Sequence, residues 1–240
     1  MHRVALLLGL CATIAPAATL ERIERDSLGR VLLFCSELPS GWSSELSPDK
    51  QRITLTIPGS TVSPGLRSRS WSEGIFREAY VQAGDTAVRI YVTAAQPTGY
   101  TVVWLPYSRC LLLTPVRWEA LSPAADLYHS ALLALELGAE AVADSLLTEA
   151  VRHGHADAAT VAALRALLRQ QPVTALSYLR QAAAQNSLPD FYGAVAHVAE
   201  MGGLLSLQRW AQTRFHALTQ RSLPPLPPIP PESLAVLTDA

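Results

Sequence analysis

The sequence has little net charge and almost no lysine. Its 19 Lys and Arg stand against 20 Asp and Glu, a formal net charge of −1, and Lys50 is the only lysine. No overall positive field therefore favours nucleic acid. The apolar run at residues 4–14 is shorter than the roughly 20 residues that a membrane-spanning helix needs. We expect neither a nucleic-acid partner nor a membrane span.

The chain also lacks the common signatures of catalysis. It contains no Gly-x-Ser-x-Gly elbow, phosphate-binding loop, His-Glu-x-x-His or Cys-x-x-Cys. Beyond the N-terminal run, its histidines all lie in the second half: His129, His153, His155, His197 and His216. No trio of them has the carboxylate spacing of a zinc site, and pairs such as His153 and His155 commonly occur at helix ends. We predict no catalytic residue, no metal and no cofactor, with a degenerate enzyme as a minor alternative.

The N-terminus has the pattern of a secretory signal peptide. Arg3 supplies a positive charge, residues 4–14 form an apolar segment, and small residues at 15–18 permit cleavage after Ala17 or Ala18. The alternative is a buried N-terminal helix. We predict a signal peptide over residues 1–18 and a periplasmic location in the cell envelope.

Two cysteines, Cys35 and Cys110, remain after residue 18. In an oxidising compartment they are a possible disulfide, whereas two buried free thiols would act as small apolar side chains. The sequence leaves both alternatives open because it does not give the distance between them.

Residues 20–118 contain an internal repeat at a shift of about 57 positions. The segment 31–36 matches 88–93, the turn Pro39-Ser40-Gly41 matches Pro97-Thr98-Gly99, and 53–56 matches 110–113 more loosely. Each half reads as strand, turn, strand, because Pro and Gly favour turns between β-branched segments. Two copies of one unit predict a duplicated antiparallel β-sandwich over residues 19–118.

This pattern resembles the AMIN domain, a small β domain that precedes bacterial cell-wall amidase domains and pilus secretins. The resemblance lies in Leu20–Ile57 and Ile75–Leu113, where a strand leads into a Gly-marked turn, then "RVLLF" or "AVRIYV", then a Pro-Gly turn with an aromatic residue. It implies a non-catalytic module that holds envelope proteins to peptidoglycan. Residues 53–62 depart from the family by lacking a clear polar motif.

A second part begins near residues 115–123, where Ala and Leu at helical spacing replace the β pattern. We predict helices at 123–137, 139–153, 157–169, 172–185, 189–201 and 204–220. The set Ala143, Leu147 and Ala150 recurs 32 positions later and, more weakly, at Ala211, Phe215 and Leu218. The spacing resembles tetratricopeptide repeats, which bind protein segments, and predicts such a domain over residues 119–221. An irregular helical bundle is the alternative.

A proline-rich tail follows at residues 222–240, in which SLPPLPPIPP favours polyproline II. It is interpreted as a stiff spacer or as a ligand for an aromatic groove. The overall fold class is thus α+β in separate regions: the β-sandwich, the helical repeats and this tail.

Candidate ligand-binding residues are arginines and one tryptophan of the β half: Arg67, Arg69, Trp71, Arg77 and Arg89. Strand alternation places Arg89 on the face opposite Val88 and Ile90, where a guanidinium is available to a peptide-stem carboxylate. Trp42 and Tyr100 hold equivalent repeat positions and either stack on a sugar or pack in the core. The other arginines have a solvated linker as their alternative.

Together these patterns predict a non-enzymatic, exported protein. Its β part attaches to peptidoglycan or an envelope protein complex, and its helices recruit a protein partner. The alternative is an assembly subunit of a secretin or another outer-membrane complex, with no glycan binding.

Overall fold

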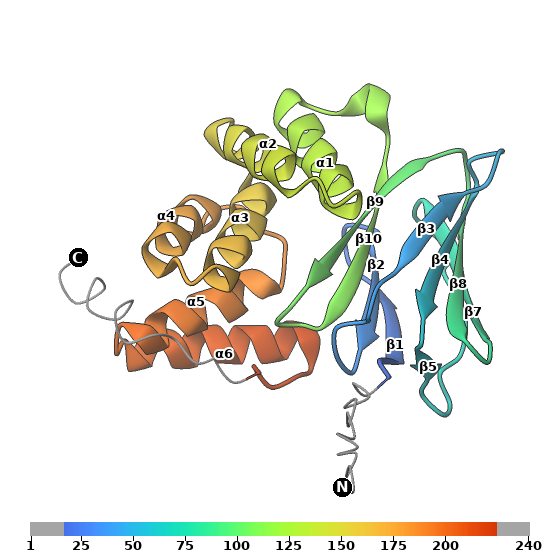
Figure 1. Ribbon diagram of the computed structural model, residues 1–240, viewed down its shortest axis with the longest axis horizontal. Helices are drawn as coiled ribbons and strands as arrows, with labels where there is room; N and C mark the ends of the chain where they lie inside the picture. Colours follow the sequence, from blue (N-terminus) through green and yellow to red (C-terminus); the bar gives the residue numbers. More distant parts are fainter. Residues whose placement is uncertain (1–16, 225–240) are drawn as a thin grey trace, which may run out of the picture.

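The computed structural model describes residues 17–224 and has two five-stranded sheets and six helices, an α+β architecture (Figure 1). The strands are β1 (Thr19–Arg25), β2 (Val31–Cys35), β3 (Ser43–Leu46), β4 (Arg52–Pro58), β5 (Thr61–Val62), β6 (Arg69–Ser70), β7 (Phe76–Ala83), β8 (Ala87–Ala94), β9 (Gly99–Leu105) and β10 (Cys110–Val116). After the 3-10 turn η1 (Trp118–Ala120), the helices are α1 (Pro123–Glu136), α2 (Glu140–Arg152), α3 (Ala156–Leu168), α4 (Pro172–Ala182), α5 (Asp190–Met201) and α6 (Leu205–Thr219). The predicted signal segment up to residue 16 and the predicted tail beyond Pro224 lie outside the described residues.

The strands form sheet A, in the order β5-β1-β2-β10-β9, and sheet B, in the order β3-β4-β8-β7-β6. All pairings are antiparallel except β1 with β5. The two Pro-Gly turns of the sequence repeat do not close hairpins. One connects β2 of sheet A with β3 of sheet B, and the other connects β8 of sheet B with β9 of sheet A.

The inner faces of the two sheets share one hydrophobic cluster. Alternate residues of each strand point into it, as strand geometry requires, and they are fully or almost fully buried. From sheet A these include Val31, Leu33, Cys35, Leu111 and Leu113; from sheet B they include Ile53, Leu55, Ile57, Val88, Ile90 and Val92. Trp42 and Tyr100 are partly buried and pack against the same cluster.

The outer face of sheet A is covered by the helices. Leu32, Phe34, Cys110 and Leu112 join a second cluster with the inner faces of the helices, among them Leu132, Leu147, Leu179 and Phe215. All five residues of β2 are buried because one face meets sheet B and the other meets the helices. The sequence division at residue 118 therefore separates two secondary-structure classes that contribute to one shared cluster.

The helices follow the predicted segments, with ends that differ by at most three residues. Ser122 caps α1 by accepting a 3.3 Å hydrogen bond from Ala125 N, and Pro123 occupies the first turn. The repeated Ala-Leu-Ala positions are buried in α2 and α4. The third set departs from the pattern, because Ala211 and Phe215 of α6 are buried but Leu218 is 56% exposed.

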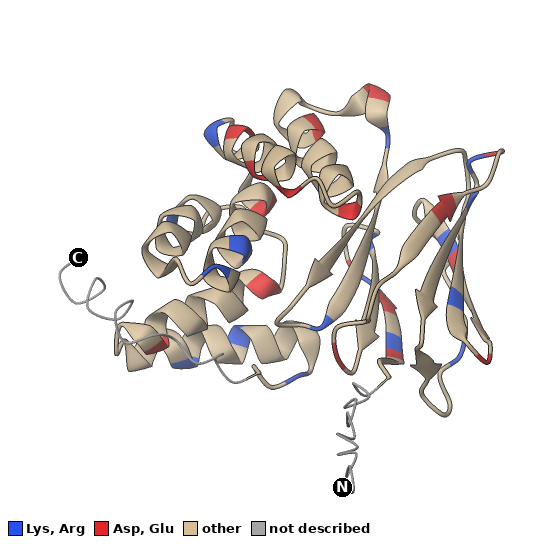
Figure 2. Ribbon diagram, in the orientation of Figure 1, with Lys and Arg blue, Asp and Glu red and all other residues tan. Residues whose placement is uncertain are grey.

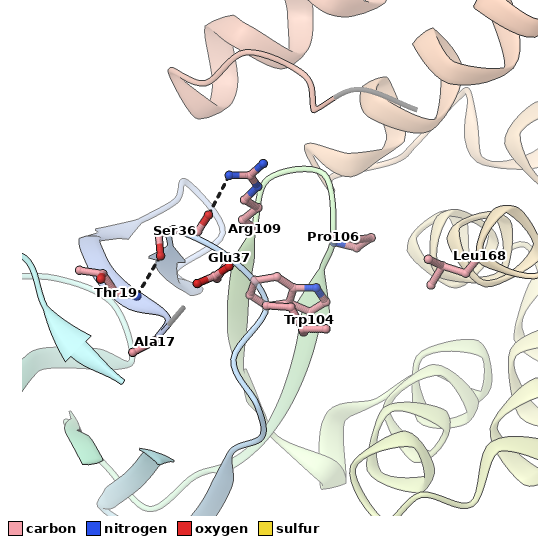
Figure 3. A pocket seen from close by; sticks show the side chains of 9 residues that line it. Ala17, Thr19, Ser36, Glu37, Trp104, Pro106, Arg109 and Leu168 are labelled. Atoms are coloured by element: carbon pink, nitrogen blue, oxygen red, sulfur yellow. Dashed lines mark hydrogen bonds between the residues drawn. The ribbon is translucent and has the colours of Figure 1, made fainter. Parts of the chain in front are cut away.

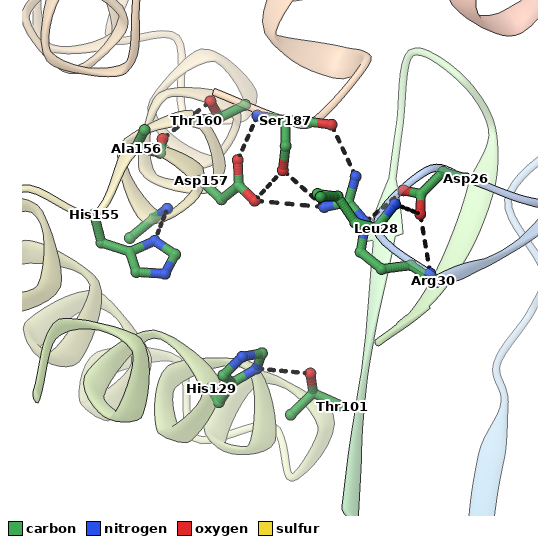
Figure 4. A network of polar contacts seen from close by, with 11 residues as sticks. Asp26, Leu28, Arg30, Thr101, His129, His155, Ala156, Asp157, Thr160 and Ser187 are labelled. Atoms are coloured by element: carbon green, nitrogen blue, oxygen red, sulfur yellow. Dashed lines mark hydrogen bonds and ion pairs between the residues drawn. The ribbon is translucent and has the colours of Figure 1, made fainter. Parts of the chain in front are cut away.

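Polar contacts hold the helices in place on sheet A (Figure 4). Arg30, which is 7% exposed, bonds Asp26 at 2.6 Å, the Ser187 carbonyl at 2.8 Å and Asp157 at 3.4 Å. His129 of α1 bonds the Thr101 hydroxyl of β9 at 3.0 Å. Except for the bond to Asp26, these contacts join residues of the β part to residues of the helical part. They therefore fix the orientation of the helical layer on sheet A.

The end of α6 returns to sheet A. Gln220 has a left-handed backbone with φ of 55°, which turns the chain toward β2. Arg221 then donates to the carbonyls of Cys35 and Ser108 at 2.8 and 3.0 Å. Its guanidinium lies 5.2 Å from the ring centroid of Phe34, and that of Arg22 lies 4.0 Å from the same ring. The C-terminal end of the helical part is thus anchored to the β part.

Candidate functional site

The outer face of sheet B is open to solvent, on the side of the molecule opposite the helices (Figure 1). The strand register places its residues in rows. One row contains Glu45, Thr54, Tyr91 and Tyr80, and the next contains Ser43, Thr56, Arg89 and Gln82. All eight side chains are polar or aromatic, and none is buried. We call this set the sheet B face.

Two tyrosines form an aromatic area on the sheet B face. The ring centroids of Tyr80 and Tyr91 lie 6.1 Å apart with an interplanar angle of 30°, and Tyr80 is 50% exposed. The Tyr91 hydroxyl donates to Gln82 Oε1 at 2.9 Å, which holds the ring in place beside Arg89. Aromatic rings beside hydrogen-bonding groups suit a ligand with both apolar and hydroxyl surfaces.

The two outer faces differ sharply in chemistry. The helix-covered face of sheet A contains Leu32, Phe34, Cys110 and Leu112, whereas the sheet B face contains Thr54, Thr56, Arg89 and Tyr91. Apolar residues on the sheet B face would favour a helical cover there as well. Its polar residues instead leave it available for a ligand.

Arg89 lies at the centre of this face, as strand alternation predicts. Val88 and Ile90 are both 0% exposed, while Arg89 points outward between Thr56 and Gln82. Its role in binding remains a prediction.

The other candidate residues do not join Arg89. Arg67 and Arg69 line a small pocket formed by β1 and the connection between β5 and β6. Trp71 packs against the inter-sheet core, with the guanidinium of Arg25 at 5.4 Å from its ring. Arg77 donates to the carbonyl of Ser72 and lies at an irregularity in the pairing of β7 with β8. The structure thus distributes the five predicted residues over four places.

Tyr80 and Tyr91 were not among the candidates from the sequence. The signal for Tyr91 was present, because it follows Arg89 by two residues and so shares its face. Tyr80 joins them only through the pairing of β7 with β8, which opposes Tyr80 and Tyr91. That cross-strand neighbour was not visible in the sequence.

A larger open pocket of about 670 Å³ lies at the end of β9 (Figure 3). Leu38, Trp104, Pro106 and Leu168 supply its apolar lining, and Leu168 is 71% exposed. On its rim, Arg109 donates to the Ser36 carbonyl at 2.8 Å. The described part of the chain places no acid–base pair and no nucleophile with a neighbouring base in this pocket.

Cys35 and Cys110 are both free thiols, so the possible disulfide is not formed. They occupy adjoining strands but opposite faces of sheet A: Cys35 belongs to the inter-sheet cluster and Cys110 to the helix-covered cluster. Side chains on opposite faces of a sheet point apart, which prevents a bond without backbone movement. Burial raises the pKa of the Cys35 thiol to about 12 and also raises that of Cys110, so neither is a reactive thiolate.

His153 and His155 lie at helix ends, as the C-cap of α2 and the N-cap of α3. His155 caps α3 by accepting a 3.2 Å hydrogen bond from Ala158 N, while His153 lies 3.4 Å from Glu149 at the end of α2. Within residues 17–224, no three His, Cys, Asp or Glu side chains gather as metal ligands would. Nor does that range contain a helix whose length and apolar character would let it cross a bilayer.

Charged residues of both signs occur in both halves (Figure 2).

Comparison with protein-family models gives no match for this chain, and comparison with curated proteins also finds no significant similarity.

Proposed function

We propose that this chain is an exported, non-enzymatic protein of the cell envelope. Its β half attaches to peptidoglycan through the sheet B face, and its helices recruit a protein partner. The observation that carries the proposal is the contrast between the two outer faces: one is apolar and covered, and the other is polar, aromatic and open.

The proposal includes a duplicated β-sandwich of the AMIN type. Support comes from the strand order. The two halves can be exchanged by replacing each of β1–β4 with its counterpart in β7–β10 (β1 with β7, β2 with β8, and so on) and the reverse. The order β1-β2-β10-β9 of sheet A then becomes β7-β8-β4-β3, which is the order of four strands in sheet B. Such an exchange is expected when two copies of one unit associate about a pseudo-twofold axis.

The residue register supports the same relation. Leu33 opposes Leu111 in sheet A, and Ile90 opposes Leu55 in sheet B. Leu33 and Ile90 are 57 positions apart, but Leu55 and Leu111 are 56 apart. Strands β4 and β10 therefore align at a shift of 56 positions, one fewer than β2 and β8.

Under this relation, the sheet B face corresponds to the helix-covered face of sheet A. Leu32 corresponds to Arg89, and Phe34 corresponds to Tyr91. We infer that one of two equivalent surfaces became the base of the helical layer, while the other retained a ligand role. Tyr80 and Tyr91 would stack on a sugar ring, and Arg89 would donate to a carboxylate or hydroxyl oxygen.

The helical part is proposed to be a tetratricopeptide-like array that binds a protein segment. Small buried residues, including Ala131, Ala143, Ala163 and Ala175, allow the successive helices to approach closely. Stacked helical pairs of this kind present extended surfaces to partners. The exposed Trp210 and Leu207 of α6 add apolar surface near the end of the array.

Sedimentation with purified sacculi tests the attachment. The full chain should pellet with sacculi, and Tyr80→Ala with Tyr91→Ala should reduce the pelleted fraction by roughly tenfold, because losing stacking on aromatic side chains costs about 1–2 kcal/mol. Tyr178→Ala, on the helical side, is a matched control and should pellet like the wild type. Equal pelleting of all three proteins would remove the sheet B face as the attachment surface.

A second candidate function is assembly on a secretin or another outer-membrane complex. The apolar pocket lined by Leu38, Trp104 and Leu168 favours it, because a polar glycan has no need of such a surface. Failure of the wild-type chain to pellet with sacculi, together with its recovery in an outer-membrane complex, would make this the leading function.

A further inference from the structure

A small polar pocket of about 290 Å³ opens at the edge of the β half, away from the sheet B face. Strand β1 forms one wall and the connection between β5 and β6 forms the other. The residues lining it include Glu21, Arg22, Ser63, Leu66, Arg67 and Arg69. Three guanidiniums and one carboxylate thus face a space large enough for a small ligand group.

Two of these charges already have partners in the fold. Arg22 donates to the Thr219 carbonyl at 2.6 Å and stacks on Phe34. Glu21 forms an ion pair with Arg221 at 2.5 Å. Arg67 and Arg69 are exposed, and neither side chain makes a hydrogen bond or ion pair with another residue between 17 and 224. Their two guanidiniums are the available charges of the pocket.

The backbone around them is held in place. Ser63 N bonds the Leu20 carbonyl at 2.9 Å, and Leu66 N bonds the Ser63 carbonyl at 3.0 Å across a turn in which Gly65 has φ of +88°. Arg69 lies on β6, opposite Ala79 of β7. The wall that carries both guanidiniums is therefore anchored to both sheets.

We propose that this pocket binds the terminal carboxylate of a peptide. A guanidinium presents paired N–H donors that match the two oxygens of a carboxylate. Phosphate sites commonly add backbone N–H groups, but those of Ser63 and Leu66 are already engaged, and Glu21 lies on the wall. A planar monoanion fits these conditions better than a phosphate dianion.

The inference rests on the proposed function, since it assigns the peptide stems of peptidoglycan as the ligand. The sheet B face would then contact the glycan, while Arg67 and Arg69 would hold a stem. Because the two surfaces lie on different parts of the β half, separate variants can address each one.

The test uses the full chain and two probes. These are diacetyl-Lys-D-Ala-D-Ala, which has one free carboxylate, and the same peptide with a C-terminal amide. Titrations followed by NMR should shift the Arg67 and Arg69 Nε–H signals and the Gly65 amide with the acid. The amide should bind at least about tenfold more weakly than the acid, because a charge-assisted interaction is lost.

The double variant Arg67→Gln with Arg69→Gln should weaken acid binding at least as much as amidation does. Arg180→Gln with Arg209→Gln removes two exposed arginines of the helices and should bind like the wild type. Equal binding of the acid and the amide would overturn the proposal, as would the absence of shifts at the pocket. Tighter binding of inorganic phosphate at the same signals would also overturn the carboxylate assignment.

The same proteins are then pelleted with sacculi. Pelleting of the wild type without any response to the acid peptide would reject the pocket and leave the proposed attachment in place. A response to the peptide without pelleting would support the pocket and reject the attachment.

Discussion

The carboxylate of Asp190 accepts a hydrogen bond from the backbone N–H of Tyr107 at 2.7 Å. It also accepts one from Ser108 N at 3.0 Å. Asp190 is the first residue of α5 and is 0% exposed, while the two amides belong to the turn between β9 and β10. One buried side chain therefore satisfies two buried donors and joins the helical layer to sheet A.

Asp190→Ala should lower the free energy of unfolding by about 3 kcal/mol, because it leaves two buried N–H groups without an acceptor. Urea denaturation of the full chain measures the change. Asp126→Ala removes a carboxylate from the first turn of α1, where it is exposed, and should cost less than about 1 kcal/mol. Similar losses in the two variants would show that Asp190 acts only through the helix dipole.

Gly193 of α5 makes a second contact with this turn. A Cβ atom at this position would lie 2.7 Å from Cγ of Tyr107, too close for any real contact. Gly193→Ala should therefore destabilise the fold by about 1–3 kcal/mol, although Ala in place of Gly normally favours a helix by roughly 1 kcal/mol. Gly202→Ala, whose Cβ would have ordinary contacts, is the control. A rise in melting temperature for Gly193→Ala would mean that Tyr107 does not pack there.

Acid should destabilise the protein through two buried histidines. Burial and, to a smaller degree, the charge of nearby His155 lower the pKa of His129 to about 4. Burial also lowers the pKa of His197 to about 4. Between the unfolded pKa of about 6.5 and this value, the unfolded chain binds protons that the folded chain does not. The stability linked to each histidine is complete above pH 6.5 and is lost as the pH falls toward 4.

Asp190 has the opposite effect on the pH dependence of stability. Burial raises its pKa to about 6, so between pH 6 and about 4 the folded chain binds the extra proton and gains stability as the pH falls. Two histidines outweigh one aspartate, and the net effect is a loss on acidification. In melts from pH 7 to pH 4, His129→Gln with His197→Gln should flatten the decline, whereas the exposed His153→Gln should not. An unchanged slope in the double variant would exclude these histidines as the cause.

The helix positions and the strand at residues 88–93 were predicted closely, because each of these segments has a clear period. Val88, Ile90 and Val92 alternate with exposed residues, and Ala143 and Leu147 recur at helical spacing. The covering of sheet A was missed, although five consecutive apolar residues in β2 are typical of a strand buried on both faces. The dispersal of Arg67, Trp71 and Arg89 was not predictable, because it depends on which strands pair at the edge of sheet B.

The isolated β part should be unstable, because the helices cover part of its apolar surface. Residues 19–118 alone would expose Leu32, Phe34 and Leu112, which the helices bury. We expect this fragment to associate or to melt without a cooperative transition. Replacing these residues with those at the corresponding positions of the sheet B face, as Leu32→Arg, Phe34→Tyr and Leu112→Thr, should restore a monomer with a cooperative melt. Size-exclusion chromatography measures whether each fragment is a monomer, and circular dichroism measures its melt. A stable, monomeric wild-type fragment would show that the β part folds without the helices.

Export should leave Ala18 as the first residue of the mature chain. Sequence pattern permits cleavage after Ala17 or Ala18, but Ala18 is 5% exposed and its carbonyl accepts a 3.0 Å hydrogen bond from Thr61 N. Cleavage after Ala17 keeps this contact and places the new ammonium group near the rim of the pocket that Thr19 and Glu37 line. Cleavage after Ala18 would remove the contact and unfix the start of β1. Intact-mass measurement of the protein from its own envelope fraction distinguishes the two, and a chain that retains Met1 would reject export by cleavage.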